Sequence, residues 1–254
     1  MSSQGTMHHP PSDVWAAGDA YERYVGRWSR PVAQEFISWL TLKRNQCWVD
    51  VGCGTGALTM TILAAAAPRE VVGVDRSGGF ISHARRQIQD PRTTFRSGDA
   101  QNLPIEDDAF DAAVSGLVLN FVPDPARAVS EMMRVTRSGG TIAAYIWDYA
   151  EGMQLMRYFW DAAVALNPAA QELDEGRRFP LCQPATLLAL FDDAGLEQTE
   201  VHTIEVPTVF DDFDDYWSPF LGGQGPAPGY CAELTEDKRA ELKDRLRCIS
   251  RDLI

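Results

Sequence analysis

The sequence has few positive charges for its length. Its 254 residues include 23 Lys and Arg against 36 Asp and Glu, which gives a formal net charge of -13. Binding to a nucleic-acid backbone or to an anionic membrane favours a basic surface. The charge balance therefore argues against both, and we predict neither a nucleic-acid nor a membrane partner.

Paired cysteines and long apolar runs are also missing. The five cysteines contain no C-x-x-C pair and are odd in number, so we predict no disulfide framework and no metal site. No apolar run approaches the ~20 residues of a membrane-spanning helix. The start, MSSQGTMHHPP, lacks the apolar segment of a signal peptide. These absences favour a reducing compartment, and we predict a cytoplasmic location.

What the sequence does contain is a regular alternation of strand-like and helix-like segments. Helix-like segments separate five apolar, strand-like ones, at residues 47–51, 70–75, 93–99, 110–119 and 141–147. Alternation of this kind implies right-handed crossovers and parallel strands. We predict an α/β, Rossmann-like fold: a mostly parallel twisted sheet with helices on both faces, plus a helical N-terminal element and late cap or lid elements. The ligand crevice would lie at the carboxyl ends of the strands.

The second half of the chain is less regular. An aromatic-rich helix, residues 153–166, interrupts the alternation, and residues 201–210 resemble a sixth strand. No seventh strand follows, so we predict a shortened sheet edge. The expected divisions are a flexible N-terminus (1–19), a core (20–148), a helical lid insertion (149–181), a returning core helix and strand (182–210), and an acidic, aromatic segment with a C-terminal helix (211–254).

The aromatic side chains of this half admit two hypotheses. They could cover a bound substrate as a lid, or they could form a core, which is the more frequent role of aromatic residues at helical spacing. The residues concerned are Tyr158, Phe159, Trp160, Tyr216, Trp217 and Phe220.

A glycine-rich turn follows the first predicted strand. Residues 49–56 read VDVGCGTG, so the glycines have the spacing G-x-G-x-G and not the G-x-G-x-x-G of dinucleotide sites. Such a turn lets backbone approach a ligand. The turn alone leaves open a nicotinamide site, another nucleotide site, or a tight turn without a ligand.

Two carboxylates follow the next two predicted strands. Asp75 ends the second strand, where its two oxygens can accept both hydroxyls of an adenosine ribose. Asp99 ends the third, where it can accept the adenine amino group while the backbone N–H of Ala100 donates to a ring nitrogen. The alternatives are a helix N-cap for Asp75 and an ordinary turn residue for Asp99.

Five motifs, in the order in which they follow one another along the chain, resemble those of a known protein family. The chain resembles a class I S-adenosylmethionine (SAM)-dependent methyltransferase, of the broad small-molecule group called methyltransferase domain 11. The similarity is dense from about residue 20 to 148 and thin afterwards. The motifs are VDVGCGTGALT, VVGVD, GDAQNLP, FDAAVSGLVLNFVPDP and RVTRSGG.

The resemblance implies a cofactor, SAM, with S-adenosylhomocysteine as product, and a small-molecule acceptor. It also implies roles for matching residues. The glycine turn would lie against the methionine portion of the cofactor, and the strand-end residues would hold the adenosine. An N-terminal helix would contribute a tyrosine and an arginine toward the cofactor's carboxylate, although its arginines could equally be solvated. The residues are Tyr24, Arg27, Arg30, Asp50, Gly52, Gly54, Gly56, Asp75, Arg76, Asp99, Ala100 and Leu117.

The sequence does not indicate a catalytic residue. Methyl transfer from a sulfonium is an in-line displacement that needs mainly alignment of the acceptor. Related sequences often carry histidine after the fourth strand, but here Asn120 and Phe121 stand there. The acceptor and the oligomeric state stay open. The alternatives to a methyltransferase are a non-catalytic SAM-binding or interaction protein and, less favoured, a nicotinamide-dependent oxidoreductase.

Overall fold

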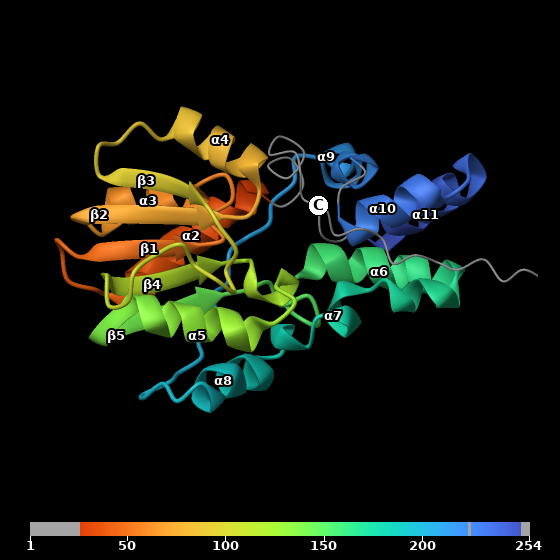
Figure 1. The fold of residues 1–254 in the computed structure, drawn as a ribbon. Helices are drawn as coiled ribbons and strands as arrows, with labels where there is room; N and C mark the ends of the chain where they lie inside the picture. Colours follow the sequence, from red (N-terminus) through yellow and green to blue (C-terminus); the bar gives the residue numbers. More distant parts are fainter. Residues whose placement is uncertain (1–25, 223–224, 250–254) are drawn as a thin grey trace, which may run out of the picture.

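The protein is built on a five-stranded parallel sheet with helices on both faces (Figure 1). The structure, a computed structural model, describes residues 26–222 and 225–249. The strand order is β3-β2-β1-β4-β5, and the predicted fold class is confirmed. The strands are β1 (Cys47–Val51), β2 (Glu70–Asp75), β3 (Thr93–Ser97), β4 (Phe110–Gly116) and β5 (Thr136–Tyr145).

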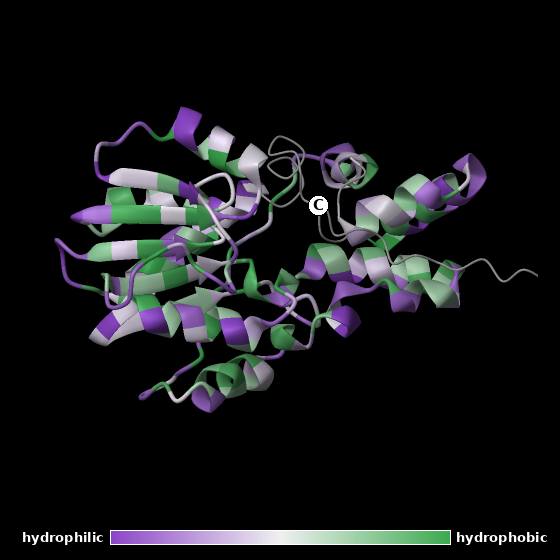
Figure 2. Cartoon of the chain, viewed as in Figure 1, coloured by the Kyte–Doolittle hydropathy of each residue, from purple (hydrophilic) through white to green (hydrophobic). Residues whose placement is uncertain are grey.

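Helices α2 (Arg27–Leu40), α3 (Ala57–Ala65) and α4 (Gly78–Gln87) cover one face of the sheet, and α5 (Pro125–Val135) covers the other. Side chains alternate between faces along a strand. Trp48 accordingly packs with α2 and α3, whereas Val49 packs with Met132 of α5. Figure 2 shows the apolar residues gathered in the strands. Burial on both faces explains why the central strands β1, β2 and β4 are largely apolar.

A second group of helices lies beyond one end of the sheet (Figure 1). It contains α6 (Gln154–Leu166), α7 (Glu175–Arg178), α9 (Phe213–Trp217), α10 (Pro226–Glu233) and α11 (Glu236–Ile249), with 3-10 turns between them. We call residues 148–182 and 211–249 the helical unit. Phe159, Trp160 and Phe220, each at most 1% exposed, lie at its centre, and their rings are in contact. The aromatic stripe is therefore a core, and the hypothesis that these side chains form a lid is wrong for them.

The predicted sixth strand is wrong. Residues 201–210 are extended but belong to no strand in the described chain. Their apolar side chains Ile204 and Val206 pack on the cluster beneath α2, and His202 stacks on Trp39 at 6.0 Å. A groove of about 1500 Å³ lies between this segment and β5. The alternation that suggested a strand records side-chain packing against a helix, not backbone pairing.

The start of the fifth strand also differs from the prediction. β5 begins at Thr136, which pairs with Phe110, and an irregularity follows before Thr141 pairs with Ala112. The helix before it is as predicted: Asp124 accepts from the N–H of Arg127 as N-cap. From residue 211 to 249 the described residues form helices and turns but no strand, in agreement with a shortened sheet edge.

Candidate functional site

The glycine turn closes β1 and opens α3. All three glycines have positive φ, +76° at Gly52, +53° at Gly54 and +94° at Gly56, a conformation that favours glycine. A Cβ on Gly52 would lie 2.5 Å from the side chain of Val118, and one on Gly56 would lie 2.5 Å from Ile88. A Cβ on Gly54 would meet no atom of the described chain within 4 Å. Gly52 and Gly56 therefore allow neighbouring side chains to pack closely against the turn, whereas Gly54 faces open space.

Asp75 connects this turn to the end of β2. Its Oδ2 accepts from the backbone N–H of Gly54 at 3.0 Å, and its Oδ1 accepts from that of Ser77 at 2.7 Å. Burial raises the pKa of Asp75, while these two hydrogen bonds and the charge of Arg76 lower it. The N-cap of α4 is Ser77, which accepts from Phe80. The N-cap hypothesis for Asp75 is therefore wrong.

Asp50 lies within β1, fully buried, opposite Gly73 of β2 and Val114 of β4. Its Oδ2 accepts from the hydroxyl of Thr59 at 2.6 Å, and its Oδ1 is buried with no hydrogen-bond partner among the described residues. Burial raises the pKa of Asp50 to about 7, against the hydrogen bond from Thr59 and helped by the charge of Asp75. An unpaired buried oxygen is unfavourable, so it is a position where a ligand's donor would be stabilised.

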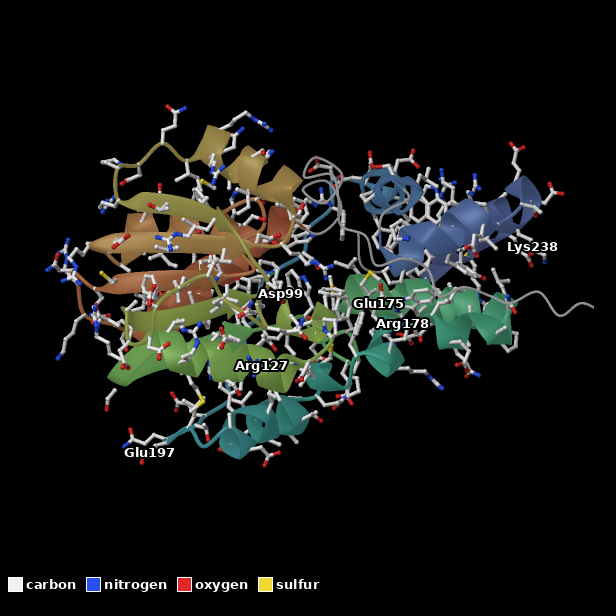
Figure 3. The ribbon with its side chains drawn as sticks, viewed as in Figure 1. Asp99, Arg127, Glu175, Arg178, Glu197 and Lys238 are labelled. Carbon is white, nitrogen blue, oxygen red and sulfur yellow. The ribbon has the colours of Figure 1, made fainter. Side chains whose placement is uncertain are left out.

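Asp99 lies at the edge of the sheet that faces the helical unit (Figure 3). It is exposed, and its carboxylate accepts from the backbone and the side chain of Gln101 at 2.9 and 3.1 Å. These bonds, and more weakly the charge of Arg76, lower the pKa of Asp99. Because Arg76 acts on both Asp75 and Asp99, the three side chains form one group. The hydrogen bond to the residue two positions on also makes Asp99 a turn residue, so both sequence hypotheses fit it.

Residues after β4 complete this edge. Leu117 is buried and has φ +61°, although it is not glycine; strain of this kind gathers at functional sites. Its N–H donates to the carbonyl of Tyr145 at 2.8 Å. Three residues on, in the 3-10 turn η2 (Leu119–Phe121), Asn120 Nδ2 is buried and has no partner within the described residues.

The two arginines of α2 have different surroundings. Arg27 donates through Nη1 to Asp215 of α9 at 2.8 Å, whereas Arg30 is exposed. Trp28 is 9% exposed and belongs to the core of the helical unit. Tyr24 lies outside the described residues. Ala100 is half-buried and packs against two core clusters.

Cys53 lies inside the glycine turn. Its thiol is buried, and its N–H donates to the carbonyl of Val74 at 3.0 Å. Burial, together with the charges of Asp50 and Asp75, raises the pKa of the thiol well above its usual range. All five cysteines are free thiols.

Sequence reasoning missed a buried carboxyl group in the helical unit. Glu175, at the start of α7, is 2% exposed and accepts a hydrogen bond from the indole N–H of Trp160. Burial raises its pKa to about 8, although hydrogen bonds to the carboxylate lower it. Nothing in the polar sequence around residue 175 sets this glutamate apart from its neighbours, so no sequence signal could have found it.

Comparison with known proteins finds one family that the sheet region resembles. A model described as "methyltransferase domain" matches residues 49–144, which include the glycine turn, Asp75, Asp99 and Leu117. Residues 49–144 are thus similar to a methyltransferase domain. The Anabaena variabilis structure of a protein from an antibiotic biosynthesis pathway has the same fold as this domain and its surroundings: TM-score 0.63, 20% identity, 87% of this chain and 86% of that one. The Bacillus subtilis YcgJ structure agrees, with a TM-score of 0.56 and 17% identity over 83% and 87% of the two chains.

Curated sequence relatives have a higher identity to this chain than these two structures, but they match a smaller share of it. The rice 2-methyl-6-phytyl-1,4-hydroquinone methyltransferase 2 (Oryza sativa subsp. japonica) is 34% identical over 167 residues, 63% of this chain and 48% of that protein. A demethylmenaquinone methyltransferase of Roseiflexus sp. is 39% identical over 95 residues, 37% of this chain and 40% of that one. The chain thus spans about half or less of the length of these curated relatives.

The described residues contain neither a metal-binding cluster nor a membrane-spanning helix. Within 26–222 and 225–249, no three His, Cys, Asp or Glu side chains are grouped so as to hold a metal ion. Over the same residues, no helix has the length and apolar character needed to cross a bilayer.

Proposed function

We propose that the protein transfers a methyl group from SAM to a small organic acceptor. The observation that carries this proposal is the glycine turn whose middle residue faces open space, with Asp75 bonded to it and Asp50 buried directly behind it. The turn stands at the junction of β1 with β2 and β4, where the strand order reverses. Ligands of open α/β sheets bind at such switch points.

The side chains fit the parts of the cofactor in turn. We assign Asp75 to the ribose hydroxyls and Asp99 with Ala100 to the adenine edge, with Arg76 on the adenine face. Gly52, Gly54 and Gly56 would lie along the methionine portion. The unpaired Oδ1 of Asp50 suits the cofactor's ammonium group.

The carboxylate would fall to Arg27 rather than Arg30, because Arg27 is half-buried and Arg30 is exposed. Two N–H groups of Arg27, on Nε and Nη2, are buried and find no acceptor in the described part of the chain. Leu117 would close the pocket beneath the ribose.

The chemistry left to the protein is mainly alignment. When bound, SAM supplies a methyl group activated by the sulfonium. The residues after β4 and β5 would hold the acceptor in line with it and exclude water. The ring centroids of Phe121 and Tyr149 lie there, 5.0 and 6.0 Å from the ring centroid of Phe179. Asn120 Nδ2 is a donor without a partner among the described residues.

The relatives support an aromatic acceptor. The rice and Roseiflexus proteins are named for a hydroquinone and for demethylmenaquinone, which are flat rings bearing oxygen. Aromatic side chains stack on such rings, and an amide donor can bind the ring oxygen. We therefore propose a small aromatic acceptor, methylated while it lies against these side chains.

Calorimetry tests the cofactor assignment. Wild-type protein should bind S-adenosylhomocysteine and not NAD. Asp75→Ala should weaken that binding by about 30- to 100-fold, because hydrogen bonds to a charged group are worth about 2–3 kcal/mol. Asp90→Ala is the matched control, since Asp90 pairs with Arg92 before the amino end of β3. Binding of NAD alone, or equal affinities for wild type and Asp75→Ala, would refute the assignment.

Turnover separates an enzyme from a non-catalytic SAM-binding protein. Methyl-labelled SAM would be incubated with pools of small hydroquinones and phenols, and transfer of label into the organic phase would be measured. Label transfer supports the proposed reaction. Tight cofactor binding without transfer to any aromatic pool would contradict the acceptor class.

A further inference from the structure

An ion pair joins the first described helix to the helical unit. Arg27 Nη1 of α2 donates to both carboxylate oxygens of Asp215 in α9, at 2.8 and 3.1 Å. The two residues are 188 positions apart in the chain. Asp215 also accepts from the N–H of Asp211, and the bond from Arg27, opposed by burial, lowers its pKa. The carboxylate is therefore charged and fixed from two sides.

The guanidinium of Arg27 is only partly used. Its Nε and Nη2 atoms are buried and without hydrogen-bond partners in the described chain. These two nitrogens carry parallel N–H groups on one edge of the guanidinium, the arrangement that binds a carboxylate with two hydrogen bonds. Asp215 occupies the third nitrogen and leaves this edge open.

Aromatic rings fix the plane of the same group. The guanidinium carbon of Arg27 lies 4.7 Å from the ring centroid of Trp28 and 4.7 Å from that of Phe210. The two rings are themselves in edge contact at 5.7 Å. With the rings setting the plane and Asp215 setting the rotation within it, the direction of the open edge is determined.

Arg27 lies at the sheet edge that carries the glycine turn. α2 ends at Leu40, shortly before β1 starts at Cys47, so the end of α2 is at the amino edge. Its 14 residues span about 21 Å, which places Arg27 at the opposite edge. Trp28 confirms this, because it packs in one cluster with Tyr149, which follows β5.

We propose that Asp215 is a positioning residue for cofactor binding: it holds Arg27 so that the open Nε–Nη2 edge meets the amino-acid carboxylate of the cofactor. This inference rests on the proposed function. It makes α9, which lies outside the methyltransferase domain, a contributor to cofactor affinity. The contribution is through orientation, since Asp215 and the cofactor carboxylate carry the same charge, and the carboxylate of Asp215 bonds to Arg27 and to the N–H of Asp211.

Two ligands separate the contribution of the cofactor's amino-acid carboxylate to affinity from that of the adenosine. S-adenosylhomocysteine carries the amino-acid carboxylate, whereas 5′-methylthioadenosine has the same adenosine and sulfur but no amino-acid portion. Calorimetry on the full chain should show that Asp215→Ala weakens S-adenosylhomocysteine about five- to tenfold and changes methylthioadenosine less than twofold, because ordering one long side chain is worth about that much. Arg27→Ala should weaken S-adenosylhomocysteine further, and the double variant should match Arg27→Ala.

Controls separate positioning from folding. Asp214→Ala removes the neighbouring carboxylate of α9, which pairs with Lys243 at 3.1 Å, and should leave both affinities unchanged. Asp215→Glu should recover part of the loss. Circular dichroism at the working temperature establishes that each variant is folded.

Several results would overturn the proposal. Unchanged or tighter binding of S-adenosylhomocysteine by Asp215→Ala would show that Asp215 does not orient Arg27 for it. Equal losses for both ligands would assign Asp215 a general structural role. If wild type bound methylthioadenosine as tightly as S-adenosylhomocysteine, the adenosine site would be supported, but the cofactor carboxylate would not contribute to affinity, and the proposal would be wrong. Failure of wild type to bind either ligand would refute the proposed function itself.

Discussion

The sheet and the helical unit use their polar groups in opposite ways. In the sheet region, carboxylates stand where strands end, and their partners are backbone N–H groups of neighbouring turns, as with Asp75 and Gly54. In the helical unit, the most buried carboxylate, Glu175, lies among aromatic side chains and bonds to Trp160. Backbone geometry therefore arranges the proposed cofactor site, whereas side-chain packing shapes the region beside it, where the acceptor is proposed to bind.

The largest expected effect tests whether this division holds. Phe159 is fully buried and stacks on Phe220 at 4.5 Å. Phe159→Ala should lower the free energy of unfolding by about 3–5 kcal/mol through lost burial and a cavity. The ring of Phe159 contacts Trp160, Phe220 and Tyr230, whereas the rings that flank Arg27 are Trp28 and Phe210. The affinity for S-adenosylhomocysteine should therefore change less than threefold while the variant is folded.

Urea unfolding followed by circular dichroism gives the stability, and calorimetry gives the affinity. Leu221→Ala, at a side chain that is 52% exposed in the same unit, is the control and should cost less than about 0.5 kcal/mol. If Phe159→Ala abolished cofactor binding in the folded state, the two regions would not be separable.

The next effect concerns pH. Since the pKa of Glu175 is raised to about 8, the folded protein keeps a proton that the unfolded chain loses near its ordinary pKa. Stability from this group is complete at low pH and is lost as pH rises through about 8. Glu175→Gln, which still accepts from Trp160, should lessen the fall in unfolding free energy between pH 5 and pH 8 by on the order of 3 kcal/mol.

Urea titrations at several pH values measure this slope. Glu197→Gln changes an exposed glutamate that follows helix α8 (Pro184–Asp193) and should keep the wild-type profile. The same profile in Glu175→Gln would show that the carboxyl group is charged in the folded protein at pH 5 and above.

The smallest expected effect lies in the glycine turn. Gly52→Ala and Gly54→Ala both place a side chain at positive φ, which costs about 1–2 kcal/mol. Gly52→Ala also puts a methyl 2.5 Å from Val118, so it should be less stable than Gly54→Ala by about 1–3 kcal/mol. Relative to the stability that each variant loses, Gly54→Ala should lose more affinity for S-adenosylhomocysteine than Gly52→Ala. The reverse order in either measurement would contradict the different roles given to the two glycines.

The sheet was predictable because its signals are local. Each strand is an apolar run that ends at a turn residue, and Asp124 with Pro125 marks the start of α5. Residues 201–210 were not predictable, since alternating side chains look the same whether they face a sheet or a helix. The start of β5 was missed because the strand, which begins to pair at Thr136, contains Gly139 and Gly140. Glycine pairs usually mark the end of a helix or strand.

The place of the candidate site residues in the fold was predictable, but their contacts were not. The order of motifs identified Asp75 and Asp99, because strand ends meet at one edge of any parallel sheet. The bond from Gly54 to Asp75 depends on how two turns face each other. The pair of Arg27 with Asp215 joins residues from the two ends of the chain, and no periodicity carries that information. Glu175 was missed because its burial comes from Trp160 and the packing of α6.

One consequence of the glycine turn has a kinetic character. The thiol of Cys53 is buried in an apolar cluster with Ile81 and Phe95, and burial raises its pKa, so that this sulfur is neither ionised nor accessible while the turn is closed. Cys248, on the outside of α11, is exposed. Since alkylation requires the thiolate, the sulfur at residue 53 reacts at the frequency with which the turn opens. The rate at which Cys53 is alkylated, compared with that of the exposed Cys248, therefore measures how often the glycine turn opens.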